Sequence, residues 1–165
     1  MKALFPVVCS LWLCACATAP ATVAHAFRLK PGQDLKREIQ AYAASNGIEA
    51  AWVATCVGSL SAYHLRFADR ETGSRGAGHF EILALTGTVS GNGSHLHLAL
   101  GDEDGRVVGG HLLDGCLVYT TAEIVLVEAT DLVFTRAHDG STKWQELQIG
   151  RRTAKSRSYL PASAQ

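Results

Sequence analysis

Apolar residues follow two different periods along the chain, and the change of period separates one helix from a series of strands. After Asp34, which can cap a helix, apolar residues fall at i, i+4, i+7 and i+8, and Asn46-Gly47 supplies a stop. The stripe consists of Leu35, Ile39, Tyr42 and Ala43. The spacing predicts one helix packed on a core, preceded by a short strand over Phe27–Leu29.

From Ala50 onward the pattern is typical of short strands separated by turn residues. Gly58-Ser59 interrupts one apolar run, Gly91-Asn92-Gly93 and Asp139-Gly140 indicate hairpin turns, and residues 68–78 are expected to form a mobile or partner-facing loop. The predicted strands are Ala50–Val57, Ser61–Phe67, Phe80–Ser90, Cys116–Thr120, Glu123–Val127, Leu132–Thr135 and Lys143–Leu147. One helix followed by many strands predicts an α+β domain with a curved, mainly antiparallel sheet.

Length and composition indicate one globular domain without a general affinity for nucleic acid. The chain has 165 residues and is 47% hydrophobic, and its 15 Lys and Arg residues balance 15 Asp and Glu residues. A protein that holds DNA through its phosphates usually carries a basic excess, which is missing here. Residues 150–165 contain few apolar side chains, and we expect a disordered tail there.

The first 26 residues have the order of a secretory signal peptide. Lys2 precedes the apolar run Ala3–Ala17, and Ala24-His25-Ala26 has the small-x-small pattern read by signal peptidase before Phe27. The run is short for a membrane span and contains Pro6. We therefore expect a domain over residues 27–149 that is exported to the periplasm or secreted.

Two alternatives to this interpretation remain open. Leu13-Cys14-Ala15-Cys16 resembles a lipobox, in which Cys16 would carry a lipid anchor and provide the only membrane contact. A start codon assigned too far upstream would instead make the protein cytoplasmic. In the exported forms Cys56 and Cys116 remain, and because each lies in an apolar run we expect unpaired core thiols.

Three of the seven histidines surround one predicted hairpin turn. His95 and His97 alternate with leucines and share one face of a strand, while His111 follows the turn Asp102-Glu103-Asp104-Gly105. If the last three of these residues form the loop, with Gly105 in the left-handed conformation, Asp102 pairs with Arg106 and His97 lies opposite His111. Three neutral imidazoles on one face with an open fourth position suit a divalent metal, above all zinc.

The alternative is that these are ordinary strand histidines. A register shifted by one residue would turn His111 to the other face and separate the three side chains. If the site is catalytic, Glu81 and Glu123 are the candidate general bases, although both lie in strand-like segments. His138, beside the last turn, is expected to lie away from the cluster.

Nucleophilic and nucleotide-dependent enzyme classes lose support from the motifs that are missing. The chain has no G-x-S-x-G elbow, P-loop, C-x-x-C pair or G-x-G-x-x-G that follows a strand.

An ordered series of short motifs resembles the PPC family, the plants and prokaryotes conserved domain, from about Phe27 to about Ile149. The resemblance implies a sandwich-like domain on a curved antiparallel sheet that assembles as a homotrimer. Prokaryotic single-domain members have histidines like His95, His97 and His111. The motifs are Leu29–Leu35, Gly58-Ser59-Leu60, Gly78–Leu83, Gly87–Ser90, Gly93–His97, Gly105–Leu112 and Tyr119–Glu123.

Two departures separate this chain from the plant members, in which the domain follows AT-hooks and contacts transcription factors. No Arg-Gly-Arg-Pro hook occurs, and His79 replaces an arginine of the plant pattern. The leading hypothesis is therefore a homotrimeric binding or regulatory module with a metal site and a small-molecule or protein ligand. A zinc-dependent hydrolase or lyase is the second hypothesis, and a DNA-associated regulatory protein is the third.

Overall fold

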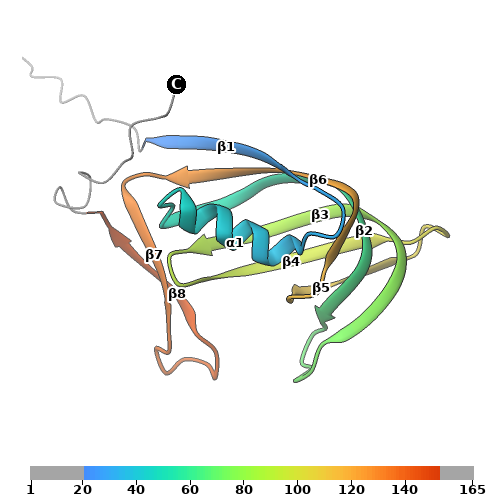
Figure 1. The fold of residues 1–165 in the computed structure, drawn as a ribbon. Coiled ribbons are helices and arrows are strands. Elements are labelled where there is room, and N and C mark those ends of the chain that lie inside the picture. The colour runs from blue at the N-terminus through green and yellow to red at the C-terminus, as the bar shows by residue number, and fades with distance from the viewer. Residues whose placement is uncertain (1–20, 153–165) are drawn as a thin grey trace, which may run out of the picture.

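A computed structural model describes residues 21–152, and it confirms the mainly antiparallel α+β fold with one helix (Figure 1). The helix α1 lies across one face of a strongly bent sheet, and a separate hairpin projects at one end of it. The elements are β1 (Thr22–Leu29), α1 (Leu35–Ser45), β2 (Ala50–Arg66), β3 (Ser74–Ser90), β4 (Gly93–Gly101), β5 (Val107–Leu112), β6 (Leu117–Ala129), β7 (Leu132–Ala137) and β8 (Glu146–Arg151).

The predicted helix forms where its capping residues and apolar stripe place it. The Asp34 carboxylate accepts hydrogen bonds from the backbone N–H groups of Lys36 and Arg37, both at 3.1 Å, and so satisfies two donors of the first turn. Leu35, Ile39 and Ala43 are buried against the sheet. The helix is therefore fixed over the concave face of the sheet by its apolar stripe.

The six-stranded sheet partly closes on itself. Its strand order is β1-β6-β2-β3-β4-β5, and the end of β2 pairs a second time, with β5, through Leu65 opposite Leu112 and Arg66 opposite His111. The long strands β2 and β3 bend to make this closure, as Figure 1 shows. β7 and β8 form a separate two-stranded sheet.

Several predicted strand breaks are wrong because bulges bend the strands without ending them. β2 is continuous through Gly58-Ser59, with register shifts against β6 between Val53 and Thr55 and between Gly58 and Leu60. β6 likewise spans both segments predicted between Cys116 and Val127. β3 begins at Ser74, so the predicted loop over residues 68–78 is shorter than expected.

Both ends of the described chain are tied to the fold by one network of hydrogen bonds and ion pairs around the buried Glu128. Nε2 of His25, in β1, lies 3.0 Å from a carboxylate oxygen of the buried Glu128, and Arg152 lies 3.7 Å from the other oxygen. Arg152 also pairs with Glu49 at 2.8 Å. Ordered structure therefore begins before Phe27, and Gly150 and Arg151 belong to β8 and not to a disordered tail. Residues 153–165 of the predicted tail and residues 1–20 of the predicted signal lie outside the described residues.

The core lies between α1 and the inner face of the sheet. Cys56 and Cys116 are buried and unpaired, as predicted, and burial raises the pKa of the Cys116 thiol to about 11. Both thiols therefore behave as small apolar side chains. Within residues 21–152, no helix has the length and apolar character needed to cross a bilayer.

Candidate metal centre

The turn between β4 and β5 has the predicted geometry. The Asp102 N–H donates to the Arg106 carbonyl at 2.9 Å, and the Gly105 N–H donates to the Asp102 carbonyl at 3.0 Å. Gly105 has a φ of 77°, which is the left-handed conformation that closes a three-residue hairpin loop. This turn sets His97 opposite His111 in the ladder, as the sequence predicts.

The three histidines converge on one point above the outer face of the sheet. Nε2 of His95, Nε2 of His97 and Nδ1 of His111 form a triangle whose three sides are each 3.1 Å. His95 and His97 reach it from alternate positions of β4, and His111 reaches it from β5. The one-residue register shift that would have separated the three side chains therefore does not occur.

The donor set fits a tetrahedral metal ion. With Zn–N bonds of about 2.0–2.1 Å, two ligand nitrogens of a tetrahedral site lie about 3.3–3.4 Å apart. The observed sides of 3.1 Å come within a few tenths of an ångström of that separation. Because these three nitrogens already lie at coordination spacing, the site needs little rearrangement to hold an ion, and a fourth position stays free for another ligand.

The surroundings keep two of the imidazoles in the neutral form that coordinates metals. Burial, followed by the positive charge of Arg66, lowers the pKa of His111 from 6.5 to about 4. Burial, followed by the charge of Arg136, also lowers the pKa of His95. Both rings are therefore uncharged at neutral pH and present free lone pairs.

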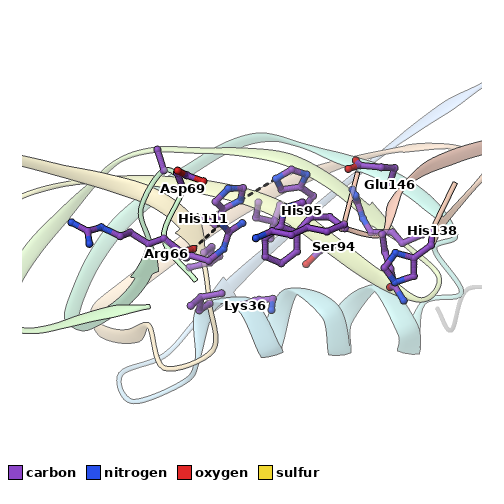
Figure 2. A pocket seen from close by; sticks show the side chains of 17 residues that line it. Lys36, Arg66, Asp69, Ser94, His95, His111, His138 and Glu146 are labelled. Carbon is purple, nitrogen blue, oxygen red and sulfur yellow. Dashed lines mark hydrogen bonds between the residues drawn. The ribbon is translucent and has the colours of Figure 1, made fainter. Parts of the chain in front are cut away.

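A cavity of about 800 Å³ opens beside His95 and His111 (Figure 2). His138, which we expected to lie away from the cluster, lines this cavity. It lies in the loop between β7 and β8. Glu81 and Glu123, the predicted carboxylates, are exposed and do not line the cavity. Glu81 lies opposite Ser59 and Gly101, and Glu123 lies opposite Arg28 and Val57.

The charged residues of this cavity escape prediction from the sequence, and three of them lie on strands that are distant in the chain from the three histidines. Arg66 lies opposite His111 through the second pairing of β2, while Arg136 and Glu146 come from the β7–β8 hairpin. Local sequence patterns cannot place these residues beside the histidines, because their positions depend on strand pairing between segments far apart in the chain.

Comparisons with known proteins agree with this fold. The pattern of the Plants and Prokaryotes Conserved (PCC) domain matches residues 17–130, more than half of the chain. The bifunctional protein GlmU of Synechococcus sp. is 46% identical over 125 residues, which are 76% of this chain and 20% of that protein. The chain thus spans about a fifth of the length of the curated relatives it matches.

Two solved structures support the same relationship. A protein of Salmonella enterica is 39% identical and superposes with a TM-score of 0.79 over 82% of this chain and 98% of its own. A protein of Archaeoglobus fulgidus, described as metal-containing, is 28% identical, with a TM-score of 0.66 over 76% of this chain and 93% of its own. Because the family pattern matches more than half of the chain, the chain belongs to the Plants and Prokaryotes Conserved domain family.

Proposed function

We propose that His95, His97 and His111 bind one divalent metal ion, zinc, in a homotrimeric binding or regulatory module. The observation that carries the proposal is the 3.1 Å triangle of imidazole nitrogens. The neutral state of His95 and His111 and the metal-containing relative at 28% identity also support it. A bound zinc ion would supply a Lewis-acidic position that holds a ligand donor.

Metal analysis of the purified protein tests this proposal. The wild-type chain should carry about one zinc ion, and the His95→Ala, His97→Ala double variant should carry almost none. His79→Ala is the matched control, because His79 is an exposed strand histidine outside the cluster whose ring stacks on Tyr119. Equal zinc in the wild type and the double variant would contradict the proposal.

The pKa shifts predict an unusual pH dependence of zinc affinity. Because His95 and His111 have lowered pKa values, few protons compete with the metal between about pH 8 and pH 6.5, and the dissociation constant should stay nearly constant there. Affinity should fall steeply only at lower pH, as the imidazoles become protonated. Competition titrations at several pH values measure this. A steady loss that begins above pH 7 would contradict the prediction.

A homotrimer would cover the apolar outer face of the sheet. On the face away from α1, Trp52, Leu83 and Tyr119 are 38%, 55% and 43% exposed. Large apolar side chains exposed on one face of a sheet favour a protein interface there. We expect light scattering on the unprocessed chain to give about three times its mass of 17.6 kDa, and Leu83→Lys to give smaller particles. A monomeric wild type at micromolar concentration would contradict this prediction.

A zinc-dependent hydrolase or lyase is the second candidate function. Glu146 favours it, since this carboxylate lines the cavity next to the histidines and its charge acts on His95. A general base near a metal site is a requirement of such enzymes. The role belongs to Glu146 and not to Glu81 or Glu123, which lie outside the cavity.

We propose export to the periplasm or beyond, with processing upstream of Thr22. Cleavage after Ala26 would divide β1 and remove His25 from the buried Glu128, whereas lipidation at Cys16 would leave β1 whole. Intact-mass measurement of the protein from its native host should therefore give a chain that begins between Cys16 and Thr22. A product that begins at Phe27, or one that retains residue 1, would contradict this prediction.

A further inference from the structure

The cavity beside the three histidines is strongly basic, although the chain as a whole carries no net charge. Five Lys and Arg residues line it against two acidic residues, a local excess of three positive charges when the histidines are neutral. Figure 2 labels four of these charged side chains beside His95 and His111, namely Lys36, Arg66, Asp69 and Glu146. The basic residues are Lys36, Arg66, Arg70, Arg136 and Lys143, and the acidic residues are Asp69 and Glu146.

Arg66 flanks the cluster on the side of His111. Its Cα is the ladder partner of His111, so the two side chains are direct cross-strand neighbours. Its guanidinium lies 4.5 Å from the centre of the Trp144 ring, a cation–π contact that holds the charge beside the cavity.

Arg136 flanks the cluster on the side of His95. It donates a hydrogen bond from Nη2 to Oγ1 of Thr88 at 2.7 Å, and Thr88 is the ladder partner of His95. Nε of Arg136 is buried and has no hydrogen-bond partner within residues 21–152. A buried donor without a partner is costly, which makes this group a natural contact for a ligand oxygen.

Neither arginine forms an ion pair in the part of the chain that the structure describes. The ion pairs there involve other basic residues, so neither of these two cavity-lining arginines is bonded to a carboxylate. The Arg66 guanidinium instead donates to the backbone carbonyl of Arg70 at 3.3 Å. A negatively charged ligand in the cavity would compensate guanidinium charge that no carboxylate neutralises there.

We infer that this cavity binds a small organic anion, through a phosphate or carboxylate group held between Arg66 and Arg136 next to the metal position. The inference rests on the proposed metal site, and it names the class of ligand that the module takes. The cavity volume of about 800 Å³ is large enough for a metabolite-sized molecule.

Calorimetric titration of the zinc-loaded protein with inorganic phosphate and with acetate tests the inference. The buffer should contain neither group, and the metal content of each sample should be measured first. At least one of the two anions should bind, and Arg66→Met and Arg136→Met should each weaken it about tenfold or more. The anion that binds more tightly identifies the ligand group. Arg136→Lys should restore part of the affinity because it retains the charge.

Arg28→Met is the matched control, because Arg28 is an exposed arginine on β1 outside the cavity. The affinity of this variant for the anion should stay within about twofold of wild type. One zinc ion per chain without binding of either anion would overturn this inference and leave the metal site intact. Binding as tight as wild type in both methionine variants would overturn it in the same way. A wild-type chain that takes up no metal would overturn both proposals.

Discussion

His111→Ala is expected to lower the affinity for zinc by at least about 100-fold. The loss of a group that merely supports a metal ligand costs about 10–100-fold, and the loss of a ligand itself should cost more. Nδ1 of His111 closes two of the three sides of the nitrogen triangle, so its removal leaves only the pair on β4. Competition with a chromophoric chelator measures the dissociation constant.

Two other histidines show whether this effect is specific. His79→Ala should change the zinc affinity by less than about threefold, because His79 lies outside the cavity and packs on Tyr119. His138→Ala is a poorer control, since His138 lines the same cavity. A His111→Ala variant that binds zinc as tightly as the His79→Ala variant would show that His111 is not a ligand.

Gly87→Ala should destabilise the protein by about 3 kcal/mol or more. Gly87 has a φ of 133°, and a Cβ there would lie 2.0 Å from the backbone oxygen of His95. A strained backbone conformation alone costs about 1–3 kcal/mol, and the clash must also push β3 from β4. Since Gly87 lies opposite Leu96, between His95 and His97, the same displacement should weaken metal binding.

Gly91→Ala is the matched control for this substitution. Gly91 lies at the end of the same hairpin, and a Cβ there would meet no atom within 4 Å. Urea unfolding of both variants at one protein concentration compares their stabilities, and the Gly91 variant should stay within about 0.5 kcal/mol of wild type. Equal stability of the two variants would contradict the close approach of β3 and β4 at Gly87.

The sequence predicts the three-histidine cluster because its geometry is local. A single three-residue loop fixes the ladder between β4 and β5, so alternation along one strand and one turn are enough to place His97 opposite His111. The helix is predictable for the same reason, because its capping residue Asp34 and its apolar stripe all lie within one short segment of the sequence.

The basic walls of the cavity depend on long-range pairing and are therefore hidden in the sequence. Arg66 reaches His111 only after bulges shift the register of β2, and such shifts cannot be counted from an apolar pattern. Arg136 and His138 come close because a separate hairpin folds beside the sheet. β1 begins at Thr22 among small residues whose composition equally suits a signal cleavage site.

Anomalous diffraction at the zinc absorption edge most directly tests the claim that these histidines form a metal site. Crystals of protein purified without chelator should give one strong anomalous peak per chain, about 2 Å from Nε2 of His95, Nε2 of His97 and Nδ1 of His111. The peak should vanish in data collected below the edge. Zinc-containing crystals with no peak among the three imidazoles, or with a peak only elsewhere on the chain, would contradict the assignment.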